Sequence, residues 1–122
     1  MYLVDDDDSA RSGLGRLLRS AGFSVVAFAS AQDYLASGPF EKPAVLILDV
    51  RMPGMSGLEL QKRLKETRGG PRIIFLTAFE DPQARAEAMA AGASAFLHKP
   101  VDEKVLFAAI EAALEGLDPN NN

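Results

Sequence analysis

Short apolar runs alternate with stretches of helical periodicity along the whole chain. The apolar runs begin near Tyr2, Ser24, Ala44, Arg72 and Ser94, and the stretches between them carry apolar residues at helical spacing. This alternation predicts five βα units and therefore a parallel sheet. The runs contain few polar residues, which is typical of strands that are buried on both faces of such a sheet.

Local signals mark where the predicted helices begin and end. Ser30 with Asp33 and Ser56 with Glu59 have the spacing of capping boxes, and Asp81 precedes a proline that suits the first helical position. Glycine can adopt the left-handed conformation that ends a helix. Glycines follow the helical stretches at Gly22, at Gly38 before Pro39, at Gly69 and Gly70 before Pro71, and at Gly92.

The last predicted helix runs from about Asp102 to Gly116. We expect it to pack on the sheet through an apolar stripe that consists of Val105, Leu106, Ala109, Ile110, Ala113, Leu114 and Leu117. Residues 118–122 are polar and turn-prone, so we interpret them as a frayed end or the start of a linker. One domain is therefore expected over residues 1–117.

Size and charge narrow the classes of function. The 122 residues suit one compact domain with a single core. Seventeen acidic and thirteen basic residues give a net charge of -4, which argues against direct contact with nucleic acid. The chain has no cysteine for a disulfide framework or a thiolate zinc site. Because no segment resembles a signal peptide or a membrane span, we expect a soluble, cytoplasmic domain that makes no contact with a membrane.

Polar residues follow four of the five predicted strands. They are Asp5 and Asp6 after the first, Asp49 after the third, Thr77 at the end of the fourth and Lys99 after the fifth. Ligands of open parallel sheets bind at the carboxyl ends of the strands. If the first and third strands are neighbours, three carboxylates meet there and require a cation, and oxygen ligands with room for water favour Mg²⁺. The sequence thus predicts a magnesium site beside a lysine that suits a phosphoryl oxygen.

Ordinary structural roles are open to some of these residues. Aspartate is a common N-cap, and this role covers Asp7 or Asp8 at the start of the first helix. The N-cap role does not explain Asp49, which ends an aliphatic run with no helix directly after it. Taken alone, Lys99 would be a surface lysine, and the single histidine, His98, is interpreted as an exposed residue at a strand end.

Four motifs in this order and spacing resemble one known family. They are Val4-Asp5-Asp6-Asp7, the segment from Leu48 to Glu59, Phe75-Leu76-Thr77-Ala78 and Phe96-Leu97-His98-Lys99-Pro100. Together they resemble the receiver domain of bacterial two-component response regulators, especially the FixJ-like subgroup, over essentially the whole chain. The resemblance implies a doubly wound (βα)5 flavodoxin-like (CheY-like) α/β fold with strand order 2-1-3-4-5.

The resemblance also assigns a metal site. Asp49 resembles the family's phosphoacceptor and is expected to bind Mg²⁺ as well. Asp6 resembles a direct magnesium ligand, and Asp5 resembles a partner that acts largely through water. The main-chain carbonyl of Arg51 resembles the third protein ligand, which leaves the arginine side chain free to vary.

Three further positions match the family. Thr77 and Lys99 resemble the pair that contacts the phosphoryl oxygens, and Thr77 also takes part in the switch. Phe96 occupies the position of the switch aromatic residue. The Lys99-Pro100 bond resembles the family's cis peptide, an isomer that is rare among X-Pro bonds.

The function implied by the resemblance is that of a signalling domain. Asp49 would accept a phosphoryl group from a histidine of a partner sensor kinase, so the only reactions catalysed would be the domain's own phosphotransfer and dephosphorylation. The alanine-rich segment 82–92 predicts a loosely anchored fourth helix. We expect the face of this helix and the fifth strand to change on phosphorylation and to form a two-fold dimer. The output would be transcription, through a DNA-binding domain outside this chain.

Other interpretations stay open at this stage. Asp5-x-Asp7-x-Ser9 loosely resembles the nucleophile motif of haloacid-dehalogenase-like phosphatases, although that assignment leaves Asp49 without a role. A pseudo-receiver would keep the fold as a protein-binding module that is never phosphorylated. A flavodoxin-like cofactor protein is disfavoured by the carboxylates in the first loop. Because FixJ-like proteins continue into a helix-turn-helix domain, we interpret the chain as either an excised or a stand-alone receiver.

Overall fold

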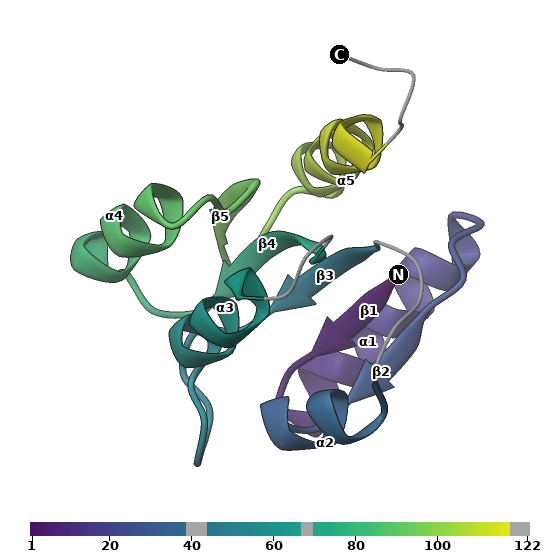
Figure 1. The fold of residues 1–122 in the computed structure, drawn as a ribbon. Coiled ribbons are helices and arrows are strands. Elements are labelled where there is room, and N and C mark those ends of the chain that lie inside the picture. Colours follow the sequence, from purple (N-terminus) through teal and green to yellow (C-terminus); the bar gives the residue numbers. More distant parts are fainter. Residues whose placement is uncertain (39–43, 67–69, 118–122) are drawn as a thin grey trace.

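The protein is described from a computed structural model over residues 1–38, 44–66 and 70–117. Strands and helices alternate along these residues (Figure 1). In chain order they are β1 (Tyr2–Val4), α1 (Asp8–Ser20), β2 (Val26–Phe28), α2 (Ala31–Ala36), β3 (Val45–Leu48), α3 (Gly57–Lys65), β4 (Arg72–Thr77), α4 (Pro82–Ala90), β5 (Ala95–His98) and α5 (Glu103–Leu117).

The strands form one parallel sheet in the order β2-β1-β3-β4-β5. The predicted fold and strand order are therefore confirmed. Val4, the last residue of β1, pairs with Phe28 on one side and with Leu48 on the other. At the other end of the sheet, Thr77 pairs with His98. This register brings the carboxyl ends of all the strands to one edge of the sheet.

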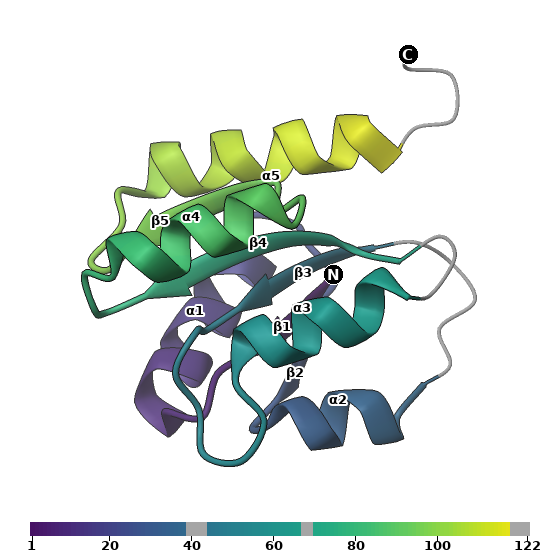
Figure 2. The ribbon, with the colours of Figure 1, turned by 60° about the vertical axis from the view of Figure 1, so that its left-hand side comes forward.

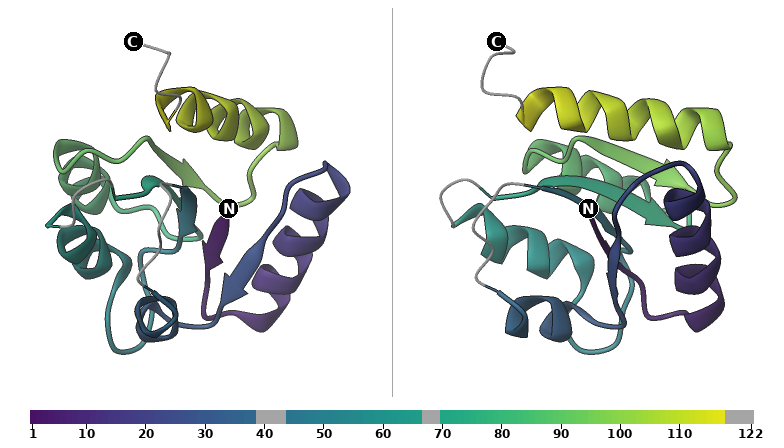
Figure 3. Two further views of the ribbon diagram at one scale, coloured as in Figure 1. Left: turned by 45° about the vertical axis from the view of Figure 1, so that its right-hand side comes forward. Right: turned by 90° about the vertical axis from the view of Figure 1, so that its right-hand side faces the viewer.

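Helices cover both faces of the sheet. α1 and α5 lie on one face and α2, α3 and α4 on the other (Figures 1 and 3). Figure 2 views the second of these faces, with α1 behind the strands. All four residues of β3 are buried. Leu46 and Leu48 belong to the core cluster under α2, α3 and α4, whereas Val45 and Ile47 belong to the cluster under α1 and α5.

The predicted helix starts are found where the sequence signals place them. Ser56 and Glu59 make both hydrogen bonds of a capping box at the start of α3. The Ser30 side chain caps α2 by accepting a hydrogen bond from the Asp33 amide. Asp81 caps α4, whose first residue is proline.

Two of the predicted helix stops have the expected backbone conformation. Gly22 and Gly92 follow α1 and α4 with φ of 96° and 98°. α2 ends at Ala36, two residues before Gly38. Pro39 and Gly69, two other residues of the predicted stops, lie outside the described residues.

The stripe predicted for the last helix is narrower in the structure. The helix runs over Glu103–Leu117, one residue later at each end than predicted. Its buried residues are Leu106, Ile110 and Ala113. Val105 and Leu114 are 50% and 41% exposed, so including them in the buried stripe was wrong. Ala109 and Leu117 are partly buried beside these three residues, whereas Val105 and Leu114 lie at the margins of the stripe, where the sheet does not cover them.

No helix within the described residues is long and apolar enough to cross a membrane. Residues 118–122 lie outside the described residues. The domain boundary after residue 117 therefore stays a prediction.

Candidate functional site

Three carboxylates meet at the carboxyl edge of the sheet. Asp5 follows β1, Asp6 is next to it, and Asp49 follows the neighbouring strand β3. The Asp49 amide donates a hydrogen bond to the Val4 carbonyl at 3.1 Å, which continues the β1–β3 pairing into the site. One carboxylate oxygen from each aspartate lies within 4.8 Å of the others. The sheet register thus creates the cluster that the sequence predicted.

Asp5 is buried, and both of its carboxylate oxygens have a polar partner. It is 2% exposed, and its Oδ1 accepts a hydrogen bond from the Asp7 amide at 2.9 Å. Its Oδ2 lies 2.7 Å from Lys99 Nζ. The same ammonium is 3.9 Å from Asp49 Oδ2. Lys99, which directly follows β5, therefore bridges two of the three carboxylates.

The buried carboxylate of Asp49 is less completely hydrogen-bonded and neutralised than that of Asp5. Its Oδ1 is buried and, among the described residues, is the one buried side-chain polar atom without a hydrogen-bond partner. Burial raises the pKa of Asp49 above its ordinary value, and the charge of Asp5 raises this pKa further. Lys99 and the amides of Val50 and Arg51 act in the opposite direction. The site holds a carboxylate that needs a further positive partner.

The donor set matches a hard divalent cation. The cluster offers carboxylate oxygens from Asp5, Asp6 and Asp49, and Asp6 is exposed to solvent. The partnerless buried oxygen of Asp49 is the atom that such a cation would satisfy. Oxygen donors with access to water suit Mg²⁺ better than a soft metal.

The other predicted site residues, Thr77 and Phe96, lie on β4 and β5. Thr77 is 1% exposed, and its hydroxyl oxygen accepts a hydrogen bond from the Phe79 amide at 3.3 Å. Its carbonyl accepts the Lys99 amide at 2.7 Å, and the Lys99-Pro100 bond is cis. Phe96 is half-buried, with its ring centroid 5.7 Å from that of Phe75. Thr77 at the end of β4 therefore lies beside Lys99, which follows β5. Phe96 lies on β5, opposite Phe75 of β4.

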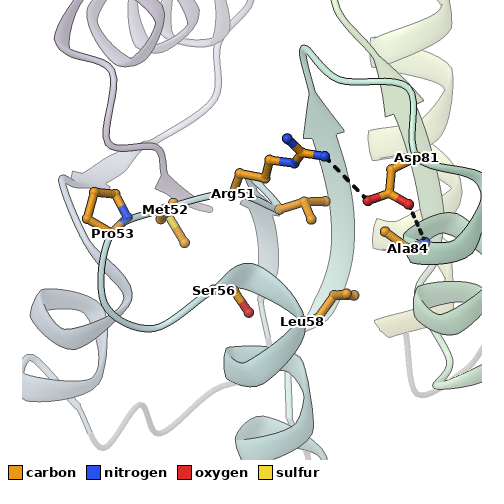
Figure 4. A pocket seen from close by; sticks show the side chains of 8 residues that line it. Arg51, Met52, Pro53, Ser56, Leu58, Asp81 and Ala84 are labelled. Carbon is orange, nitrogen blue, oxygen red and sulfur yellow. Dashed lines mark hydrogen bonds and ion pairs between the residues drawn. The ribbon is translucent and has the colours of Figure 1, made fainter.

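The Arg51 side chain makes contacts that the sequence analysis did not anticipate. Its guanidinium carbon lies 4.4 Å from the centroid of the Phe79 ring, and Nη2 lies 3.8 Å from Asp81 Oδ2. Asp81 Oδ1 meanwhile accepts the Ala84 amide at 3.0 Å (Figure 4). Arg51, Asp81 and Ala84 border a groove of about 440 Å³ between the β3–α3 loop and the start of α4. Neither sequence spacing nor a local motif relates Arg51 to Asp81.

Gly57 sets how closely α3 approaches the site. Its amide donates to the Val50 carbonyl at 2.9 Å. A Cβ atom on Gly57 would overlap the carbonyl oxygen of Asp49 and press on the Phe75 ring at 3.1 Å. Only glycine lets the first turn of α3 rest against the backbone of Asp49.

Comparison with known proteins decides the family. The family model described as the response regulator receiver domain matches residues 1–111. The chain belongs to this family. Receiver domains are signalling domains, and the expectation of a FixJ-like receiver with a CheY-like fold is confirmed. The match leaves the phosphatase alternative without support.

Several relatives are regulatory proteins. The chain is 40% identical over 119 residues to the transcriptional regulatory protein FixJ of Bradyrhizobium diazoefficiens, a match that covers 98% of this chain and 58% of that protein. It is 43% identical over 115 residues to the response regulator protein TodT of Pseudomonas putida strain F1, with 94% and 51% covered. The receiver domain thus spans about half the length of these curated relatives.

Solved structures agree with this assignment. FixJ-N superposes with a TM-score of 0.89 at 38% identity, covering 96% of this chain and 94% of that one. The response regulator StyR superposes with a TM-score of 0.87 at 47% identity, covering 95% and 59%. Both similarities extend over nearly the whole receiver domain.

Proposed function

We propose that this receiver domain accepts a phosphoryl group on Asp49 from a phosphohistidine of a partner sensor kinase, with Mg²⁺ bound at the acidic cluster. The observation that carries the proposal is the Asp49 carboxylate, which has a partnerless buried oxygen and lies beside Asp5, Asp6 and Lys99. A carboxylate oxygen of Asp49 attacks phosphorus while the bond from phosphorus to the imidazole nitrogen breaks. Phosphoryl transfer needs positioning and charge neutralisation more than it needs acid or base groups.

The metal-binding role falls to the residues at the ends of β1 and β3. Asp6, Asp49 and the main-chain carbonyl of Arg51 would hold Mg²⁺ directly, and Asp5 would do so through water. Bound Mg²⁺ would supply positive charge that stabilises the phosphoryl oxygens and keeps Asp49 ionised. The donor chemistry of the cluster supports this assignment.

Lys99 and Thr77 act on the transferred group. The Lys99 ammonium is already shared between Asp5 and Asp49, so a point charge lies next to the acceptor before any phosphoryl group arrives. The Thr77 hydroxyl can donate a hydrogen bond to a phosphoryl oxygen, because among the described residues it takes part in a single hydrogen bond, as an acceptor.

The output is a change at the face formed by α4 and β5. Thr77 moves toward the phosphoryl oxygens, Phe96 follows it, and the altered face forms a two-fold dimer. The name of FixJ, a transcriptional regulatory protein, supports transcription as the controlled process. A DNA-binding domain beyond this chain would carry out that step, and the cytoplasm is the compartment that we predict.

Intact-mass measurement after incubation with Mg²⁺ and acetyl phosphate tests the proposal. We expect one added phosphoryl group on the wild-type protein and none on Asp49→Asn, which keeps the size of the side chain but loses the nucleophile. Asp33→Asn, a change at an exposed aspartate of α2, is the matched control and should be labelled like the wild type. An unlabelled wild type would favour the pseudo-receiver, and a phosphoryl group on Asp5 would favour the dehalogenase-like mechanism.

A further inference from the structure

Arg11, in the first turn of α1, folds back over the loop that carries the acidic cluster. Its Nη1 donates a hydrogen bond to the main-chain carbonyl of Asp5 at 2.8 Å. Its Nη2 donates to the carboxylate of Asp8. The Arg11 side chain is 21% exposed, whereas that of Asp8 is 91% exposed. The guanidinium therefore connects the end of β1 with the start of α1.

With this contact, every polar group of Asp5 has a hydrogen-bond or ion-pair partner. The Asp5 amide donates to the Phe28 carbonyl at 3.2 Å, and its carboxylate is held by the Asp7 amide and Lys99. The carbonyl is the one remaining polar group of Asp5, and Arg11 holds it. The next residue, Asp6, is exposed, and within the described part of the chain no hydrogen bond or ion pair involves its carboxylate. The conformation of Asp6 thus depends on the peptide unit that Arg11 holds.

We infer that Arg11 is a positioning residue for the cation site, because it fixes the Asp5–Asp6 peptide so that the Asp6 carboxylate stays close to Asp49. The inference rests on the proposed function, in which Asp6 is a magnesium ligand. Asp8 is almost fully exposed, so its ion pair with Arg11 contributes little. The hydrogen bond to the Asp5 carbonyl carries the effect. Groups that orient metal ligands without touching the metal commonly set the affinity of a site.

The charge and the position of Arg11 act on cation binding in opposite directions. A guanidinium near three carboxylates repels an incoming cation, so loss of its charge alone would tighten Mg²⁺ binding. Loss of the hydrogen bond to Asp5 would free the peptide and weaken binding. Weaker Mg²⁺ binding without the guanidinium therefore identifies Arg11 as a positioning residue, whereas tighter binding identifies it as a surface charge only.

Calorimetric titration of the metal-free protein with Mg²⁺ tests the inference. Arg11→Gln should weaken binding by about 10-fold, the lower end of the range for such orienting partners. Arg11→Lys keeps the repulsion of the cation but replaces the planar guanidinium with an ammonium on a flexible chain, so its affinity should be lower than that of the wild type. Arg16→Gln is the matched control, because it removes the same charge from the same helix, and Arg16 donates only to Ser12 Oγ at 3.3 Å. Its affinity should equal that of the wild type.

A second measurement needs no metal. Amide exchange at Asp7, whose amide donates to Asp5 Oδ1, should be faster in Arg11→Gln than in the wild type or Arg16→Gln, at melting temperatures that show all three proteins to be folded. Affinity in Arg11→Gln equal to or tighter than that of the wild type would overturn the inference. If Arg11→Gln does not fold, Arg11→Lys decides, since wild-type affinity in that variant would overturn the inference and weaker affinity would support it.

A wild type that binds no Mg²⁺ would overturn the proposed function as well, whereas an effect missing only in the Arg11 variants would leave that function intact.

Discussion

Asp49 occupies a position where folding disfavours a negative charge. Its carboxylate is largely removed from water, one of its oxygens lacks a hydrogen-bond partner, and Asp5 lies next to it. Burial and then Asp5 raise the pKa of Asp49, and Lys99 offsets only part of this. A residue in this situation lowers the stability of the metal-free protein, and its negative charge becomes favourable when a bound cation neutralises it.

Asp49→Asn should therefore stabilise the metal-free protein at neutral pH. We expect a gain of about 1 kcal/mol, which for a domain of this size corresponds to a rise in melting temperature of roughly 4 °C. The folded-state pKa lies above the unfolded value, so protonation of Asp49 favours the folded state. The advantage of the variant should be complete above the raised pKa and disappear as the pH falls through it toward the ordinary value of 3.8.

Thermal melts in a metal-chelating buffer at several pH values measure this effect. Asp33→Asn removes a charge from the first turn of α2, where a carboxylate is favourable, and should give no stabilisation. An Asp49→Asn protein that melts at or below the temperature of the wild type at neutral pH would show that the cluster carries no net repulsion.

At the scale of the elements, α3 and α4 are fixed by contacts that join them to the site. α3 rests on the Asp49 carbonyl through Gly57. α4 buries only alanines, Ala84 and Ala88, but the Gln61 side chain donates to the Ala88 carbonyl at 3.0 Å near its end. At its start, Asp81 is shared between the Ala84 amide and Arg51 (Figure 4). The helix that the alanines predicted to be loosely anchored thus has a polar contact at each end.

Gly57→Ala should destabilise the protein, although alanine is normally the better helix former. The added methyl group would collide with the Asp49 carbonyl, so α3 must move, and we expect a loss of about 2 kcal/mol. Gly13→Ala is the matched control, because a Cβ atom there meets nothing within 4 Å. This change should stabilise α1 by up to about 1 kcal/mol. Urea denaturation measures both, and a Gly57→Ala protein as stable as Gly13→Ala would contradict the close approach.

At the scale of the whole molecule, the site lies at one edge of the sheet and the proposed output face at β5, an outer strand. The shared β4–β5 pairing, with Thr77 opposite His98 and Phe75 opposite Phe96, connects the two. We propose that a shift of Thr77 on phosphorylation would pass through this strand pairing to the half-buried Phe96 ring. This arrangement favours a change of surface shape without a change of fold.

A beryllofluoride mimic of the phosphoryl group should convert the monomer into a dimer. The reason is the proposed change of the α4–β5 face, so sedimentation should show a doubled mass with the mimic and Mg²⁺, and amide exchange should slow in residues 82–96. Asp49→Asn should stay monomeric under the same conditions. A wild type that remains monomeric at high concentration, with unchanged amide exchange in that segment, would contradict the proposed output.

The βα alternation and the helix starts at Ser56 and Asp81 could be predicted from the residues alone, and the strand order followed from the family resemblance. The alternation and the helix starts depend on local patterns, since apolar runs, caps and glycines act within a few residues of one another. The sequence also placed aspartates, a threonine and a lysine at strand ends. Five residues of the candidate site could therefore be named from their positions alone: Asp5, Asp6, Asp49, Thr77 and Lys99.

The pairing of those residues depends on how the strands and loops pack in three dimensions. Lys99 bridges Asp5 and Asp49 because β5 and β1 reach the same edge of the sheet, and Arg51 meets Asp81 because two loops converge there. The exposure of Val105 and Leu114 likewise depends on which row of α5 contacts the sheet. Such contacts join residues that are distant in the chain. Periodicity and spacing cannot specify them, since they result from how elements pack and not from local preference.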